Sequence, residues 1–316
     1  MDLTPSQQRT LDGLLRDRDT PRPSFDAELA LDLRDELEER LAPVAALLPD
    51  GEQLHVNKGA LSQVLACERY HLAAAEDAFS WTVANARGTI AHKAVELSVT
   101  MDAETPPLVL VDAAIERILD DGGDYSPRDW LNEASMAEVA ELKAEVNDIV
   151  VKFQECFPPL DKRWRPRTES PARVELCADA IVLRSKVDLA LGRPNGLEAR
   201  VVIIDLKTGR AHGNHIDDLR FYALLDTIRN GVPPFRIASY YLESARWHHE
   251  DVDAEVLRAT VRRVSDGVIK LAELRLTARE PDITPNPACG WCPARDGCAG
   301  AETWVSMSAA RALGEL

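Results

Sequence analysis

Three short stretches of the chain carry side chains that could hydrolyse a phosphodiester bond with the help of a metal ion. They are Gly88-Thr89-Ile90-Ala91-His92, Lys186-Val187-Asp188 and Asp205-Leu206-Lys207-Thr208-Gly209. Such hydrolysis needs a hard divalent cation, ligands that hold it, and a cationic group beside the attacking water. The carboxylates of Asp188 and Asp205 can supply oxygen ligands for the metal, and His92 can supply an imidazole ligand. The ammonium of Lys207 can be the cationic group beside the water.

The elements expected around these stretches would position them. Residues 201–204 form a β-branched run typical of a buried strand, so Asp205 follows at its end and Lys207 shares its face. The alternation over 173–183 and the run 187–191 predict strands before it. We expect helices over 87–99 and 214–229 and a further strand over 236–242. This order predicts an α/β fold with helices packed on a sheet.

The rest of the chain is expected to be largely helical. Further helices are predicted by apolar periodicity and by breaks at proline-rich positions. Their ranges are 25–41, which ends before Pro43, then 59–75, 135–157 and 252–276, with breaks at 21–23, 105–107 and 120–127.

The charge of the chain is unevenly distributed. The 316 residues carry a net charge of −16, while residues 161–220 hold 12 Lys or Arg against 9 Asp or Glu. This balance argues against indiscriminate binding to polyanions. It fits either a local phosphate-contacting face on an acidic body or simply a solvated acidic surface on the helical first half. No apolar run could span a bilayer and the first residues lack signal-peptide features, so we expect a cytoplasmic protein with no membrane partner.

Together, the three stretches resemble the motifs of the PD-(D/E)XK nuclease superfamily, in the RecB-like branch that includes CRISPR-associated RecB-like exonucleases. Asp205 to Gly209 matches the third motif, Asp-x-Lys-Thr-Gly, in full. The second motif ends in Asp188, with Ser185 where glycine is usual. The fourth, Gln-x-x-x-Tyr, ends in Tyr222 but begins with Asp218. The resemblance covers roughly residues 56–300 and implies a restriction-endonuclease-like mixed sheet core, in the order αβββαβ.

On this resemblance we divide the chain into four parts. Residues 1–55 would be an N-terminal helical extension, and 56–160 a helical region that carries Cys67 and the His92 motif. Residues 161–283 would be the nuclease core, and 284–316 a cysteine-rich tail.

The resemblance also implies roles for single residues. One Mg²⁺ or Mn²⁺ would be held by His92, Asp188, Asp205 and the carbonyl of Leu206, and Lys207 would orient or deprotonate the water. The resemblance makes Tyr222 a positioning residue, and Glu96 a member of the outer shell or of a second metal site. Glu169 stands roughly where relatives carry an acidic residue. Basic residues near the motifs are expected to contact nucleic acid: Arg87, Arg184, Lys186, Arg210 and Arg220.

Four cysteines suggest a second cofactor. Cys289, Cys292 and Cys298 follow the spacing Cys-x2-Cys-x5-Cys, and three thiolates need a fourth ligand. In a subset of the resembled family, one cysteine before the core and three after it hold a four-iron, four-sulfur cluster, which makes Cys67 the fourth ligand here. Structural zinc is the alternative, for which His71 could also serve as a ligand.

The sequence thus predicts a Mg²⁺- or Mn²⁺-dependent deoxyribonuclease. It would be an exonuclease that prefers single-stranded DNA and acts in repair, recombination or defence. The alternative is a weakly active or inactive nuclease-fold subunit that binds DNA within a larger complex, with a helicase or another repair or defence subunit as partner.

Overall fold

The computed structural model describes residues 3–14, 21–121, 123, 126–209, 215–277 and 279–312. The helices are α1 (Pro5–Leu14), α2 (Leu29–Ala45), α3 (Lys58–Ala66), α4 (Glu68–Glu76), α5 (Val83–Thr100), α6 (Pro107–Asp121), α7 (Arg128–Glu133), α8 (Met136–Cys156), α9 (His215–Asn230), α10 (Ala254–Leu276) and α11 (Ala299–Ala312), with short 3-10 turns η1 (Lys162–Trp164) and η2 (Pro287–Gly290). The strands are β1 (Leu54–Asn57), β2 (Arg167–Leu176), β3 (Ile181–Leu191), β4 (Val202–Lys207), β5 (Arg236–Tyr241) and β6 (Arg246–Asp251). None of the helices described is long and apolar enough to cross a membrane.

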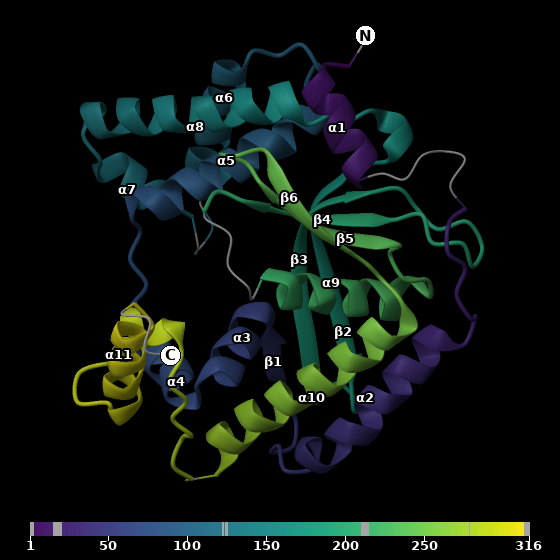
Figure 1. The fold of residues 1–316 in the computed structure, drawn as a ribbon, viewed down its shortest axis with the longest axis vertical. Helices are drawn as coiled ribbons and strands as arrows, with labels where there is room; N and C mark the ends of the chain where they lie inside the picture. Colours follow the sequence, from purple (N-terminus) through teal and green to yellow (C-terminus); the bar gives the residue numbers. More distant parts are fainter. Residues whose placement is uncertain are drawn as a thin grey trace. The chain divides into compact units, whose positions relative to one another are not determined.

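The strands form a mixed sheet (Figure 1). Its order is β1-β3-β4-β5-β6, and β2 also pairs with β3. Strand β4 is antiparallel to β3 and parallel to β5, while β1 is parallel to β3 and β6 antiparallel to β5. The succession α5, β2, β3, β4, α9, β5 contains the predicted αβββαβ order, so the predicted fold class is confirmed.

The chain folds into two compact units. Unit 1 comprises residues 1–29, 80–172 and 186–254, and unit 2 comprises residues 30–79, 173–185 and 255–316. Strand β3 therefore begins in unit 2, where it pairs with β1, and ends in unit 1, where it pairs with β4.

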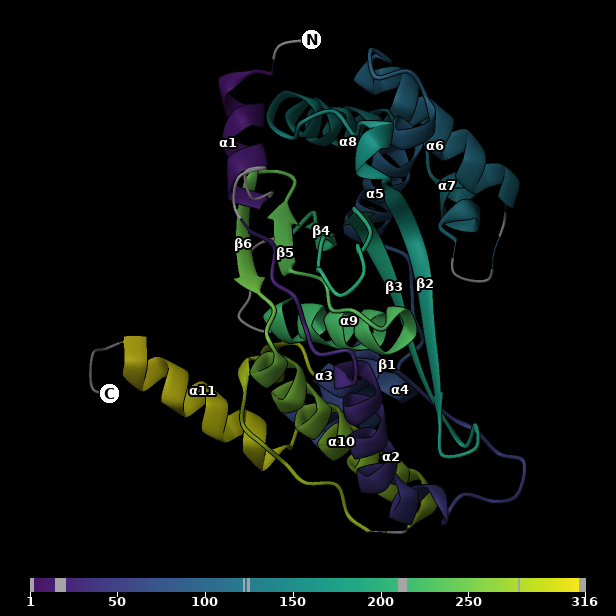
Figure 2. The same cartoon turned by 90° about the vertical axis from the view of Figure 1, so that its right-hand side faces the viewer.

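Unit 1 has its core between one sheet face and a layer of helices. Helices α5, α6 and α8 contact one another (Figure 2), and their apolar stripes bury residues such as Ile90, Leu110 and Val146. Alternate residues of β3, β4 and β5 fill the sheet side of this core: Leu189, Leu191, Val202, Ile204, Leu206, Ala238 and Tyr240. Asp205, which lies between Ile204 and Leu206 in sequence, therefore points away from this core.

Helix α1 is anchored in unit 1 through the ends of other elements. Arg236 on β5 donates to the carbonyl of Gly13 in the last turn of α1, at 2.8 Å. Side chains at the start of α1 in turn donate to carbonyls at the end of α8, which have no partner within their own helix. The pairs are Thr4 with Glu155 at 3.0 Å, Gln7 with Gln154 at 2.8 Å and Thr10 with Cys156 at 2.7 Å.

Unit 2 is built around α10. Helix α2 runs beside α10 in both views (Figures 1 and 2), and α2 buries Leu33, Leu37 and Leu41. Gly267 on α10 lets α3 approach closely, because a Cβ atom there would lie 2.6 Å from Leu61.

Several predicted element boundaries are wrong. The helix expected over 59–75 is broken at Cys67, which is extended and separates α3 from α4. The strand expected over 173–183 is two strands with a turn between them, where Cys177, Ala178 and Asp179 all have positive φ. Pro43 lies inside α2 rather than after it, since in the last turn it removes only one hydrogen bond. Strands β1 and β6 are too short and too polar to have been predicted.

Candidate metal centre

His92 is presented by helix α5, which begins at an N-cap where the Thr82 side chain accepts from Asn85 N–H. The stripe containing Ile90 and Ala94 is buried in the unit 1 core, so His92 lies at the edge of that stripe with its side chain 26% exposed. One turn earlier, Gly88 allows α5 to come close to the end of β4, because a Cβ atom at Gly88 would lie 3.0 Å from Thr208 Oγ1. The first and third motifs thus meet at this glycine.

Asp188 is held in place by the neighbouring strand. β3 and β4 pair through Leu189 and Ile204, and the same register continued by one residue sets Asp188 opposite Asp205. Residues opposite each other in antiparallel strands share a face. The N–H of Leu206 donates to Asp188 Oδ2 at 2.8 Å, while Oδ1 faces His92. The Asp188 side chain is only 12% exposed.

Glu169 joins the site from β2. Its backbone has φ of 47°, in the left-handed region that non-glycine residues rarely adopt within a strand. Such strain persists only where the surroundings hold it, and it is frequent at functional sites. Here it accompanies a carboxylate directed at His92, while Lys186 on β3 forms an ion pair with the other oxygen of the same carboxylate.

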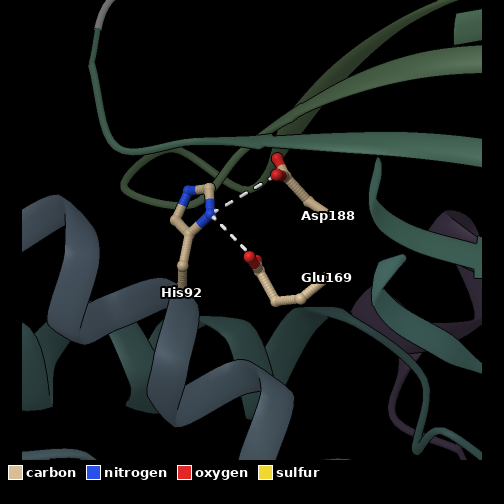
Figure 3. Close-up of side chains that lie close together, drawn as sticks. All are labelled: His92, Glu169 and Asp188. Atoms are coloured by element: carbon tan, nitrogen blue, oxygen red, sulfur yellow. Dashed lines mark ion pairs between the residues drawn. The ribbon is translucent and has the colours of Figure 1, made fainter. Parts of the chain in front are cut away.

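His92, Glu169 and Asp188 form a triangle of ligand atoms (Figure 3). His92 Nδ1 lies 3.7 Å from Asp188 Oδ1 and 3.9 Å from Glu169 Oε1, and all three atoms lie within 4.8 Å of one another. Ligands about 2.1 Å from a shared octahedral ion are about 3.0 Å apart when adjacent and about 4.2 Å apart when opposite. The two distances from His92 Nδ1 fall within that range. Carboxylate oxygens suit Mg²⁺ or Mn²⁺, and imidazole is a common ligand of divalent transition-metal ions. The donor set therefore fits a divalent metal ion.

Asp205 and Lys207 form a second group on β4. Lys207 Nζ lies 2.5 Å from Asp205 Oδ2, with the Asp205 side chain 1% exposed and that of Lys207 19% exposed. Asp205 is not part of the ligand triangle, although the strand register brings it beside Asp188. As arranged here, Asp205 orients the ammonium of Lys207.

Comparison with known proteins identifies the family. The model of the PD-(D/E)XK nuclease superfamily matches residues 55–299. The chain belongs to the PD-(D/E)XK nuclease superfamily. No curated protein matches it. Among the solved structures it is similar to one titled "Crystal structure of SSO0001", with 13% sequence identity and a TM-score of 0.35 over 86% of this chain and 97% of that chain.

Membership of the superfamily directs attention to Tyr222 and Glu96. Tyr222, on α9, is 1% exposed, so its side chain lies inside the protein rather than at the surface. Glu96 lies one helical turn after His92 and is paired with Lys93 at 2.6 Å. Neither residue belongs to the ligand triangle, and their roles stay predictions.

Strand β5 places Tyr241 beside the Asp205–Lys207 pair, a residue that none of the sequence motifs includes. Tyr241 is the partner of Lys207 in the β4–β5 register, and its hydroxyl lies 3.0 Å from His215 Nδ1. Burial is the main cause that raises the pKa of Tyr241; a Ser239 hydrogen bond opposes it and the charge of Asp205 adds to it. A neutral phenol thus lies close to the Asp205–Lys207 pair.

The basic residues predicted to contact nucleic acid differ in their surroundings. Arg87 bridges Glu145 at 3.2 Å and Glu243 at 3.1 Å, and Arg220 forms two bonds to Glu250 at 2.7 and 2.8 Å. Lys186 is 63% exposed beside the ligand triangle, and Arg184 is exposed on the part of β3 that belongs to unit 2. Arg210 lies outside the described residues. Of the four that the structure describes, Lys186 is the one placed at the triangle.

The four predicted cluster cysteines line one cavity in unit 2: Cys67, Cys289, Cys292 and Cys298. Cys67 and Cys298 are buried, and the N–H of Asn286 donates to Cys289 Sγ at 3.5 Å. His71 Nδ1 lies 3.2 Å from Gln63 Oε1, and His71 does not line the cavity. The structure thus brings the four cysteines to one place, and a cofactor held by them stays a prediction.

Proposed function

We propose that this nuclease is a Mg²⁺- or Mn²⁺-dependent DNA exonuclease that prefers single-stranded DNA and acts in repair, recombination or defence. The observation that carries the proposal is the His92–Glu169–Asp188 triangle, adjacent through the strand register to the Asp205–Lys207 pair. It combines ligands for a hard cation with a positioned ammonium, the two requirements for phosphodiester hydrolysis.

Each residue of the site has a distinct task in this proposal. A bound divalent ion would lower the pKa of its water and offset charge on the phosphate. Asp188, fixed by the Leu206 N–H, presents one oxygen to the site, and Glu169 presents a second. Lys207, oriented by Asp205, stabilises negative charge that develops on the phosphate oxygens.

The direct test compares variants on end-labelled DNA with Mn²⁺. Lys207→Met and Asp188→Asn should each lower the rate of single-strand degradation by about 100-fold or more, because preorganised charge in an active site contributes on that scale. Lys143→Met is the matched control, since it removes a lysine that pairs with Asp112 on a different helix. Undiminished degradation by both site variants would refute the assignment.

The mode of cleavage needs its own substrate. An exonuclease requires a strand end, so linear single-stranded DNA should be degraded while circular single-stranded DNA of the same sequence persists. Cleavage of the circle at the same rate would replace the exonuclease proposal with an endonuclease. Double-stranded DNA and RNA of the same length, assayed in parallel, test the proposed preference for single-stranded DNA.

We also propose that the four-cysteine cavity holds a four-iron, four-sulfur cluster. Its support is that the four thiols line one cavity, while no three cysteine sulfurs among the residues described lie within 4.8 Å of one another. A tetrahedral zinc site would bring sulfurs to about 3.8 Å from each other, since Zn–S bonds are about 2.3 Å. A cluster binds each thiolate through a different iron and so needs a wider spacing. Anaerobic purification followed by iron, sulfide and zinc analysis decides between them.

A second candidate function is a DNA-binding subunit with weak cleavage of its own, working with a helicase or another subunit. It is favoured by Asp218 in place of the usual glutamine and by the carboxylate partners of Arg87 and Arg220. Mn²⁺ titration with and without DNA separates the two functions, because a scaffold does not require the metal at Asp188.

A further inference from the structure

Glu68 is a buried carboxylate directly after Cys67, at the start of α4. Its side chain is 1% exposed, and both of its oxygens accept hydrogen bonds. Lys270 on α10 donates to Oε1 at 2.6 Å, and Arg279 binds in a fork, at 2.6 Å to Oε2 and 3.1 Å to Oε1. The backbone N–H of Asp282 donates to Oε2 at 2.8 Å. A carboxylate buried to this extent requires such partners.

The partners of Glu68 belong to the segment that leads to the cysteine tail. Around Asp282 the two chain segments are joined by backbone contacts: Arg69 N–H donates to the Asp282 carbonyl at 3.4 Å, and Cys67 Sγ lies 3.7 Å from the same oxygen. Four residues later, the Asn286 side chain donates to the Ala66 carbonyl at 3.2 Å. Residues 66–69 are thus fastened to residues 279–286.

Asn286 carries this connection to the tail cysteines. Its side-chain oxygen accepts from Ala288 N–H at 2.8 Å and so caps the turn η2, which contains Cys289. Its backbone N–H faces Cys289 Sγ. The carboxylate of Glu68 is thus linked to both groups of cysteines. Asp282, which donates to Glu68, also contacts Cys67, and Asn286, four residues further along the chain, contacts Cys289.

We propose that Glu68, through Lys270 and Arg279, is a positioning residue that assembles the four-cysteine cavity before any metal binds. The inference uses the cysteines of the proposed cluster but does not require that the cofactor be iron–sulfur. The contacts that join the two segments are hydrogen bonds and ion pairs between protein groups. The charges explain why this carboxylate matters, because it is the buried anion shared by Lys270 and Arg279, whose other carboxylate partners, Asp282 and Glu273, are much more exposed.

The test measures how fast Cys67 meets the tail cysteines in metal-free protein. Full-length chain is stripped with a chelator and a reductant, then treated with diamide, and disulfides between Cys67 and the tail are quantified by peptide mapping. Glu68→Gln should slow formation of these disulfides by about tenfold or more, because a neutral amide replaces the buried carboxylate and weakens its charge-assisted hydrogen bonds with Lys270 and Arg279. Glu52→Gln is the matched control, since Glu52 also pairs with a cation of α10, Arg275, but at an exposed site. It should leave the rate within about twofold.

A second variant keeps the proposal testable if Glu68→Gln fails to fold. Arg279→Lys retains the charge but loses the two-pronged hydrogen bonding, so it should slow the same disulfides to an intermediate extent. Far-UV circular dichroism establishes that each variant is folded. The proposal would be overturned if folded Glu68→Gln or Arg279→Lys protein formed disulfides between Cys67 and the tail as fast as the Glu52→Gln control. Uptake of iron and sulfide is measured separately. If the wild-type chain forms these disulfides rapidly but takes up no iron, the iron–sulfur proposal is refuted and the positioning role of Glu68 is not affected.

Discussion

Replacing Glu169 with glutamine tests the ligand triangle directly. The substitution preserves the size of the side chain and removes one of the two negative charges facing His92 Nδ1. Loss of groups that merely orient metal ligands lowers metal affinity by about 10- to 100-fold. Loss of a ligand carboxylate should therefore weaken Mn²⁺ binding by about 100-fold or more.

Replacing Lys186 with glutamine should act in the opposite direction. Lys186 forms an ion pair with Glu169, so the ammonium competes with a metal ion for that carboxylate. The lysine side chain is 63% exposed, and an ion pair as accessible as this contributes at most about 1 kcal/mol. Since about 1.4 kcal/mol corresponds to a tenfold change, Mn²⁺ binding should tighten by no more than about fivefold.

The assay is Mn²⁺ titration of the protein without DNA, followed by the electron paramagnetic resonance signal of free Mn²⁺. Glu198→Gln is the control, since it removes a carboxylate of unit 1 that pairs with Arg200 at 2.8 Å and lies outside the triangle. If Glu169→Gln bound Mn²⁺ as tightly as the control, Glu169 would not be a ligand. If Lys186→Gln weakened binding, the competition argument would be wrong.

Two further predictions concern α9 and α5. Burial is the main cause that raises the pKa of Asp226. The stability this residue contributes is therefore complete below its ordinary pKa and is lost as pH rises through the higher pKa of the folded state. Asp226→Asn should raise the melting temperature at pH 7, and the difference from wild type should shrink as pH falls toward the ordinary pKa of Asp; an equal gain at all pH values would contradict this. Gly88→Ala should weaken Mn²⁺ binding, because the added Cβ atom presses on Thr208 and shifts the helix that carries His92. The melting temperature should change little, because alanine gains about 1 kcal/mol of helix propensity that offsets this strain. Unchanged affinity, measured by the same titration, would show that α5 is not displaced.

The parts of the fold that sequence predicts well are those with strong periodicity. The β-branched run before Asp205 and the apolar stripe of α9 each have one stable arrangement against a core, so β4, α9 and β5 followed from pattern, while the full αβββαβ order was implied by the family resemblance. The turn at Cys177 to Asp179 was missed because three successive residues with positive φ have no glycine or asparagine among them to signal it.

The candidate site divides in a similar way. His92, Asp188, Asp205 and Lys207 stand in motifs with fixed spacing, so their types and order carried information. Glu169 has no such spacing, and its direction depends on a left-handed backbone conformation inside a strand, which the neighbouring residue types do not encode. The partners of Arg87 and Arg220 come from elements distant in sequence, and only the tertiary structure supplies them.

The fastening of α1 to α8 has a practical consequence for anyone who expresses part of this chain. The segment similar to the superfamily begins at residue 55, so a recombinant fragment cut there would lack Thr4, Gln7 and Thr10. Three carbonyl groups at the end of α8 would lose their donors and Arg236 would lose its acceptor in α1, at a cost of about 1 kcal/mol for each bond. Boundaries drawn from motif similarity would thus remove a helix whose contacts stabilise unit 1.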